Sequence, residues 1–242
     1  MTAAQGAWRA AAQADAADVS GNVHFRKLTL ENGRTTVKLL LAFGDATGLR
    51  CEIAAQVPQP FTSVREAVER TQGAAGVNGG YFQPDGQAVG WLVANGVTLH
   101  RWERARLLSG VFWVQNGTPH LQRSDGQPFS FKVEGAVQSG PFLVDHATPV
   151  SGLEATRSAP RTFLYMSRQG RFGIGSAWSA TLAETASLLA GLELSPGDRL
   201  DRCLNLDGGS STAFFARTPD PGFDAPGWAR LNNCVVIAAR GK

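Results

Sequence analysis

The sequence predicts a single mixed α/β (α+β) domain, in which a large, mostly antiparallel β-sheet packs with a few helices. The chain has 242 residues, a length that often forms one β-rich domain. Short apolar or alternating segments recur between Asn-Gly and Asp-Gly dipeptides, which favour hairpin turns. Segments at Ser63 and Thr181 carry the hydroxyl-x-x-Glu pattern that begins a helix. Strands should therefore outnumber helices.

Residues 1–20 are Ala-rich and carry Arg9, Asp15 and Asp18, so they lack the apolar run of a signal peptide. We expect a poorly ordered lead or a short helix here, followed by the domain proper over residues 21–242. On this evidence the protein is either cytosolic or has lost a leader that preceded the first residue.

The first predicted elements are two paired strands and a helix. Residues 24–30 and 35–43 alternate well enough to form strands, joined by a turn at Asn32-Gly33. A helix should begin at Ser63, because Glu66 stands at the capping-box spacing.

The middle of the chain should be antiparallel sheet. Residues 74–82 indicate a short strand and residues 84–145 a β-meander. Its predicted turns are at Asp85-Gly86, Asn95-Gly96, Asn116-Gly117 and Asp125-Gly126.

The last third should contain a helix that begins at Thr181, with Glu184 completing its capping box. Pro and Gly make residues 217–229 a loop. Strands are predicted at residues 161–167, 171–177, 202–206 and 231–240.

Composition and charge limit the partners. Hydrophobic residues make up 43% of the chain and charged residues 18%, as in a globular protein with a sizeable core. The formal net charge is +3, and the cluster Arg101, Arg104 and Arg106 falls short of a nucleic-acid footprint. No window of 18 apolar residues occurs, which excludes a transmembrane helix. A small anionic substrate fits this charge, whereas nucleic acid does not.

Three cysteines, Cys51, Cys203 and Cys234, show neither C-x-x-C pairing nor zinc spacing. We interpret them as small buried residues, and a Cys203–Cys234 disulfide is the alternative. The four histidines fall in separate segments, so a His-based metal site is not expected.

Two Gly-Gly corners are the main candidates for chemistry: VNGGYF at residues 77–82 and LDGGSSTAFF at residues 206–215. Each follows a capped helix and a short strand. Successive glycines let backbone N–H groups approach an anion closely, although the same pair also serves in ordinary turns. We expect the corners Asn78-Gly79-Gly80 and Asp207-Gly208-Gly209 to face one cleft.

Asp207 is the first candidate for a reactive carboxylate, because it ends an apolar strand and begins a loop. Asn78 holds the equivalent place with an amide that suits a sugar hydroxyl or a phosphate oxygen. For both residues the alternative is a turn-capping role. Ser210 and Ser211 lack the G-x-S-x-G context of a serine hydrolase.

Four segments, GVNGGYF, QSGPFLV, APRTFLYM and LNLDGGSST, occur in an order and spacing that resemble the phosphodiester glycosidase family. The resemblance covers roughly residues 70–240. It implies a mixed α/β fold with a large antiparallel sheet, an exported protein, and a hydrolase that cleaves the glycosidic bond of a GlcNAc-1-phosphodiester-like substrate. Ser210 departs from the pattern, since many members carry a third glycine there. The motif positions that line the family's site are Asn78, Gly79, Gly80, Arg161, Asp207, Gly208, Gly209 and Ser211.

The roles that follow are catalytic for Asp207, Arg161 and Asn78. Arg161 would bind the departing phosphate with its planar fork, and Asp207 would be the nucleophile or general base. A second carboxylate decides between retention and inversion, with Glu134, Asp145 and Glu154 as candidates. The predicted substrate-binding set is Gly79, Gly80, Tyr81, Gly208, Gly209, Ser210, Ser211 and Trp228, in which Tyr81 and Trp228 would offer a sugar a stacking surface.

Two other functions stay open at this point. A metal-dependent phosphodiesterase would hold a divalent cation with Asp207 and Asn78. A non-catalytic module for envelope glycans would use the same corners without a competent carboxylate. For the glycosidase we expect no required cofactor.

Overall fold

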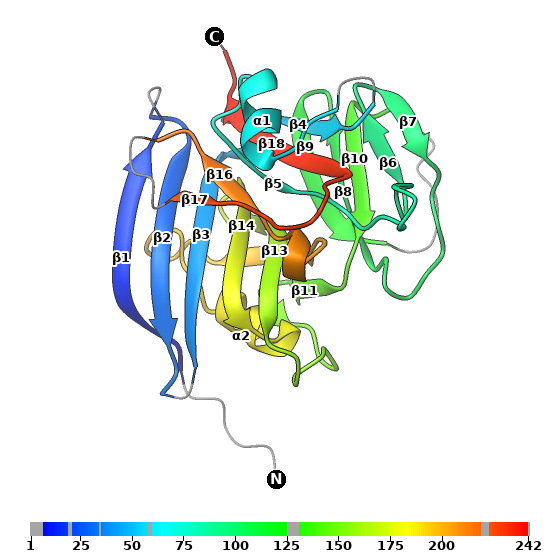
Figure 1. The fold of residues 1–242 in the computed structure, drawn as a ribbon. Coiled ribbons are helices and arrows are strands. Elements are labelled where there is room, and N and C mark those ends of the chain that lie inside the picture. Colours follow the sequence, from blue (N-terminus) through cyan, green and yellow to red (C-terminus); the bar gives the residue numbers. More distant parts are fainter. Residues whose placement is uncertain are drawn as a thin grey trace.

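The computed structural model describes residues 7–18, 21–33, 35–57, 60–124, 131–218 and 223–241. Over these residues the chain is rich in strands, contains two α-helices and pairs its strands antiparallel throughout. The predicted sheet-rich class with few helices is confirmed, but the strands divide into three sheets (Figure 1). None of the helices described is long and apolar enough to cross a membrane.

The eight-stranded sheet forms the blue and yellow body of Figure 1, and β14 joins its N-terminal strands to the later ones. Its β2, β3, β13, β14 and β15 correspond to strands that the sequence predicted. In spatial order the strands are β1 (Arg9–Ala17), β2 (His24–Glu31), β3 (Thr36–Asp45), β14 (Arg171–Ala180), β13 (Ala159–Ser167), β15 (Leu200–Asn205), β11 (Phe142–Asp145) and β12 (Thr148–Pro149).

The strand β1 corrects the expectation of a poorly ordered lead or a short helix for residues 9–17. It pairs with β2 from Arg9 opposite Glu31 to Ala17 opposite His24, and most of its side chains are exposed. An unpaired edge of β2 offers a row of backbone hydrogen-bonding groups, and this pairing overrides the helix preference of the alanines.

The other two sheets have five strands each. The first, in green in Figure 1, has the order β7 (Val97–His100), β6 (Leu92–Ala94), β10 (Gly135–Ser139), β8 (Gly110–Gln115) and β9 (Thr118–Arg123). The second has the order β17 (Asp224–Ala225), β16 (Phe214–Ala216), β5 (Ala75–Asn78), β18 (Asn233–Ala239) and β4 (Leu49–Ala55).

The predicted meander over residues 84–145 is wrong in its order. The turns at Asn95-Gly96 and Asn116-Gly117 do close local hairpins, with positive φ at each residue. However, β10 inserts between the two hairpins and β11 crosses to the eight-stranded sheet. Local turn chemistry predicts a hairpin, but not which long-range partner a later strand takes. The Asp125-Gly126 turn lies outside the described residues.

The two helices cover different sheets. Helix α1 (Val64–Arg70) packs on the β5/β16/β18 sheet, and α2 (Leu182–Ala190) packs on the eight-stranded sheet. The capping box at Thr181 is complete, as predicted. At α1 only half of the box forms, because the Glu66 carboxylate accepts from the Thr62 N–H and hydroxyl instead. Two short 3-10 turns, η1 (Ala46–Gly48) and η2 (Gly209–Ser211), complete the elements.

All three cysteines are buried and free. Cys203 lies on β15 and Cys234 on β18, in different sheets, so the Cys203–Cys234 disulfide does not form. The interpretation as small buried residues is therefore the right one, and burial raises the pKa of each thiol well above its ordinary range.

Candidate active site

The candidate site lies where the three sheets meet. The strand β5 ends at Asn78, β15 is followed by Asp207, and β13 carries Arg161 near its start. The connection between β10 and β11 adds Gly140. In Figure 1 the orange turn η2, which follows Asp207, lies beside β13. Segments far apart in the chain thus bring their predicted residues to one place.

The two Gly-Gly corners touch each other directly. The Asp207 N–H donates to the Gly79 carbonyl (3.1 Å), and Asn78 Nδ2 donates to the Asp207 carbonyl (2.8 Å). These two hydrogen bonds fix the position of the Asp207 backbone relative to the end of β5. The two corners are far apart in the sequence, and these hydrogen bonds bring them together as predicted.

Asn78 is buried, with 2% of its surface exposed. Its Oδ1 accepts from the Thr162 hydroxyl (2.7 Å) and from the Ala213 N–H (3.0 Å). Together with the bond to Asp207, these contacts occupy most of the hydrogen-bonding capacity of the amide. Asn78 therefore holds the site together and has little capacity left for a substrate.

The N–H groups of the two glycines at the first corner are also occupied by hydrogen bonds within the protein. The Gly79 N–H donates to the Asn233 carbonyl (2.8 Å), and the Gly80 N–H donates to Asn233 Oδ1 (3.0 Å). A Cβ on Gly79 would stand 1.7 Å from Asn233 Oδ1, so only glycine fits. These N–H groups face the protein and cannot cradle an anion, contrary to the hypothesis of two anion-binding corners.

Asp207 occupies a half-buried position at the second corner. Its Oδ1 accepts from the Gly208 N–H (2.9 Å), and the Ser211 hydroxyl also donates to the carboxylate. Burial raises the pKa of Asp207 above its ordinary value, while the bonds from Ser211 and Gly208 act against that rise. Gly208 and Ser211 thus orient the carboxylate, and Gly208 does not offer its N–H to a ligand.

The outer part of this corner is open. Gly209 has a φ of +64°, and no atom lies within 4 Å of the place where its Cβ would be. Within the described part of the chain, the structure records no partner for the Gly209 N–H. The Ser210 carbonyl accepts from the N–H groups of Trp228 (2.9 Å) and Ala229 (3.1 Å). Trp228 is thereby anchored beside η2 with 91% of its surface exposed.

Arg161 contacts this corner from β13. A Cβ on Gly208 would lie 3.9 Å from Arg161 Cδ. The guanidinium donates to the carbonyls of Ala180 (3.3 Å) and Arg157 (2.7 Å), and its Nη2 lies 3.6 Å from the Glu154 carboxylate. Its side chain is only 12% exposed. For the residues described, no partner of Nη1 is recorded, so one face of the fork stays available.

The charge of Arg161 is incompletely compensated. Burial lowers the pKa of the guanidinium, and Glu154 acts in the opposite direction. A buried cation of this kind gains from a second anion nearby. The Arg161 site therefore suits a phosphate.

Tyr81 closes the side of the site next to Gly140. Its hydroxyl donates to the Gly140 carbonyl (2.5 Å) and accepts from Asn205 Nδ2 (3.1 Å). Burial and the nearby Asp207 charge raise the pKa of Tyr81 to about 12, so the phenol stays protonated at neutral pH. Tyr81 is thus held by the protein and stands within the electrostatic reach of Asp207 and Arg161.

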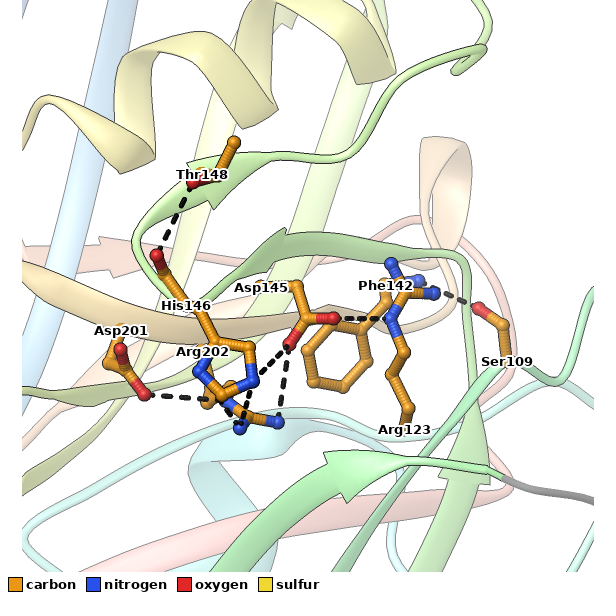
Figure 2. Close-up of polar contacts among 8 residues, drawn as sticks. All are labelled: Ser109, Arg123, Phe142, Asp145, His146, Thr148, Asp201 and Arg202. Carbon is orange, nitrogen blue, oxygen red and sulfur yellow. Dashed lines mark hydrogen bonds and ion pairs between the residues drawn. The ribbon is translucent and has the colours of Figure 1, made fainter.

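Of the three candidate second carboxylates, Glu154 alone contacts a predicted site residue. Glu134 accepts from the N–H groups of Asn116 and Gly117 and lines a separate cavity of about 620 Å³. Asp145 is held between Arg123 (2.6 Å) and Arg202 (3.2 Å), as Figure 2 shows. Glu154 accepts from the Thr156 hydroxyl and two N–H groups, which lower its pKa, so it is an anion rather than an acid.

The chemistry of a metal site is a poor match to this corner. The Asn78 oxygen already accepts two hydrogen bonds, so it has no lone pair free for a cation beside Asp207. Among the residues that the structure describes, no three His, Cys, Asp or Glu side chains gather into a group that could hold a metal ion. The expectation that no cofactor is required stays a prediction.

Sequence reasoning did not single out Thr162, Asn205 or Asn233. Asn205 lies within the LNLDGGSST segment, two residues before Asp207, so its position offered a local indication. Thr162 follows Arg161 directly, and its hydroxyl is buried against Asn78. Asn233 lies more than 150 residues after the glycines that it locks, and nothing near it in the sequence marks the contact.

The chain is similar to known proteins in sequence family and in fold. The family model described as phosphodiester glycosidase matches residues 71–238. No curated protein sequence matches the chain. The fold is similar to that of the zebrafish N-acetylglucosamine-1-phosphodiester alpha-N-acetylglucosaminidase catalytic domain, auto-inhibited by its pro-peptide. That match has a TM-score of 0.63, 13% identity, and coverage of 99% of this chain and 85% of that one.

Two further solved structures share the fold. A hypothetical protein from Synechocystis matches with a TM-score of 0.60 and 13% identity, over 90% of this chain and 62% of that one. A Burkholderia pseudomallei protein that is named "putative exported protein" matches with a TM-score of 0.56 and 12% identity, over 84% and 74% of the two chains. The family match extends over well more than half of the sequence and includes both Gly-Gly corners and β13. The chain therefore belongs to the phosphodiester glycosidase family.

Proposed function

We propose that this protein hydrolyses the glycosidic bond of a sugar-1-phosphodiester, releasing a free sugar and a phosphomonoester. The observation that carries the proposal is the position of Gly208 between the two groups: its N–H donates to the Asp207 carboxylate, and a Cβ on it would lie 3.9 Å from Cδ of the mostly buried Arg161. Carboxylate and guanidinium suit opposite ends of the bond that breaks: the developing positive charge on the sugar and the negative charge on the phosphate.

In the proposed reaction the bond between the anomeric carbon and the phosphate oxygen breaks, and its electron pair leaves with the phosphate. Asp207 either takes a proton from the water that attacks the anomeric carbon, or attacks that carbon itself. In the second case water then cleaves the bond between the sugar and Asp207 and frees the carboxylate. Water supplies the new hydroxyl of the sugar, and its second proton goes to the medium or the phosphate. A phosphate monoester has a second pKa of about 6, so it leaves as a stable anion with little need of a general acid.

Arg161 and the Gly209 N–H would share the negative charge of the leaving phosphate. Each preorganised donor of this kind typically contributes about 3 kcal/mol to the stability of a transition state. The ion pair with Glu154 keeps the fork of Arg161 from rotating, and the Ala180 and Arg157 carbonyls fix its plane. A phosphate that approached Nη1 would therefore meet a fixed donor.

The sugar would pack on Trp228, whose exposed ring is tied to η2 through the Ser210 carbonyl. An aromatic face beside a carbohydrate is a common way to bury the apolar side of a pyranose. N-acetylglucosamine is the sugar that we propose, because the zebrafish relative of the same fold is named for it. Export from the cytoplasm is a further part of the proposal, supported by the name of the Burkholderia neighbour, "putative exported protein".

The test is an NMR time course of the protein with methyl N-acetylglucosamine-1-phosphodiester, with and without EDTA. The proposal expects free reducing sugar and methyl phosphate in both samples. Sugar-1-phosphate and methanol, lost when EDTA is added, would identify a metal phosphodiesterase instead. Absence of any product, together with binding of the diester, would favour the envelope glycan-binding module.

A further inference from the structure

We propose that the loop of residues 101–108, here called the basic loop, binds a polyanionic chain that forms the leaving-group side of the substrate. This inference rests on the proposed function for the identity of the reacting bond. It adds that the leaving phosphate belongs to a chain with further phosphates or other anionic groups, which the basic loop recognises.

The basic loop lies against the wall of the candidate site. A Cβ on Gly140 would stand 1.9 Å from the Leu107 carbonyl oxygen and 2.9 Å from the Ser109 nitrogen. The carbonyl of Gly140 itself accepts a hydrogen bond from the Tyr81 hydroxyl. Ser109 Oγ accepts from the Phe142 N–H (2.8 Å), a contact drawn in Figure 2. One glycine thus separates the end of the basic loop from Tyr81 and, next to it, Asp207.

The basic loop is held in one conformation by a buried amide. Gln138 Oε1 accepts from the N–H groups of Trp91 (2.9 Å) and Glu103 (3.1 Å), and its Nε2 donates to the Glu103 carbonyl (2.8 Å). Gln138 is only 1% exposed. The rings of Trp91 and Trp102 also pack together, with centroids 5.9 Å apart. A loop fixed in this way can present charges to a ligand without a large ordering cost.

The charges that the basic loop presents are mostly positive. Arg101, Arg104 and Arg106 are exposed, and the single acid of the loop, Glu103, is tied down through its backbone and lies 3.5 Å from His100. No ion pair of Arg101 or Arg106 is recorded within the described ranges. Arginines elsewhere show the contrast, since Arg123 and Arg202 share Asp145 (Figure 2).

A single phosphate does not account for these cations. Arg161 and Gly209 lie at the reacting bond, whereas the basic loop lies beyond Tyr81 and Gly140. In the proposal, its arginines bind negative groups further along the leaving chain. Clustered cations beside a site raise the local concentration of a polyanion and lower its dissociation rate, and both effects weaken with salt.

The test measures binding by calorimetry, so that it does not depend on turnover. The probes are a short glycerol-phosphate oligomer that ends in N-acetylglucosamine-1-phosphate and the methyl diester of the same sugar phosphate. Both are titrated into Asp207→Asn protein, which keeps them intact. We expect the oligomer to bind roughly 10-fold more tightly than the methyl diester at low salt. This difference in affinity should disappear when Arg101→Gln and Arg106→Gln are introduced into the Asp207→Asn protein. It should also disappear at high salt.

The matched control adds Arg9→Gln/Lys27→Gln, which removes two exposed cations from β1 and β2 at the far edge of the eight-stranded sheet. It should retain the full difference between the probes. Equal affinity for the two probes, or an unchanged preference without Arg101 and Arg106, would overturn the inference. So would single-stranded DNA of equal charge that binds as tightly as the oligomer.

Failure of the proposed reaction gives a different result. Suppose that wild-type protein never cleaves the methyl diester but the oligomer still binds through the basic loop. The basic loop is then a polyanion-binding site, and the hydrolase assignment is wrong.

Discussion

The corners Asn78-Gly79-Gly80 and Asp207-Gly208-Gly209 have nearly the same sequence but opposite roles in the structure. At the first, the polar side chain and both glycine N–H groups bond inside the protein. At the second, the carboxylate is only half buried and the space around Gly209 is empty. The first corner is a brace, and the second is the one where we propose that the substrate binds.

The difference comes from what stands behind each corner. Asn233 fills the space behind the first corner with an amide that matches both N–H groups. Behind the second corner, a Cβ on Gly208 would meet the Pro160 carbonyl oxygen at 3.0 Å and Arg161 Cδ at 3.9 Å, whereas no atom of the described residues lies within 4 Å of the Cβ position of Gly209. Of the four glycines at the two corners, Gly209 is therefore the one whose N–H has no recorded partner among the residues that the structure describes.

The largest effect should follow the loss of the carboxylate at the open corner. Asp207→Asn should lower kcat/KM by at least roughly 1,000-fold, because an amide neither attacks the anomeric carbon nor takes a proton from water. The melting temperature should change little, since Asn78 binds the Asp207 backbone rather than its side chain. Wild-type turnover in this variant would remove Asp207 from the mechanism.

Arg161→Lys should reduce kcat/KM by about 100-fold, because lysine keeps the charge but loses the planar fork. Arg168→Lys is the matched control, on the exposed turn that follows the same strand, where Arg168 lies 4.0 Å from Asp201. Kinetics of this control should stay within about 2-fold of wild type. Equal losses in the two variants would mean that Arg161 acts only through general charge.

The glycines allow a direct comparison of stability. Gly79→Ala should lower the free energy of unfolding by about 3 kcal/mol, because its Cβ would overlap Asn233 Oδ1. Gly209→Ala should cost about 1 kcal/mol, since only the positive φ opposes it and the space is open. Urea unfolding of both variants measures the difference. The reverse order would contradict the assignment of the first corner as a brace.

The smallest effect concerns the pH dependence of the open corner. The acidic limb of kcat/KM should reflect the Asp207 carboxyl, which must be ionised to react. Ser211→Ala removes a donor that lowers this pKa, so the limb should move to higher pH. A profile that stays in place, measured on folded variant protein, would mean that another group controls the limb.

Much of the fold could be predicted from the sequence, because strand alternation, Asn-Gly turns and the Thr181 cap act over a few residues. Residues 9–17 and the place of β10 could not, since both depend on the partner that a strand finds across the sheet. The site follows the same division. Asp207 and Arg161 stand in recognisable motifs, but the closing of Gly79 and Gly80 depends on Asn233, which is remote in sequence.

The most direct measurement is hydrolysis of the methyl diester by wild-type protein in water labelled with heavy oxygen, followed by mass spectrometry of both products. If Asp207 directs cleavage at the anomeric carbon, the label appears in the N-acetylglucosamine and the methyl phosphate stays unlabelled. Label in the phosphate would show attack at phosphorus and contradict the roles given to Asp207 and Arg161.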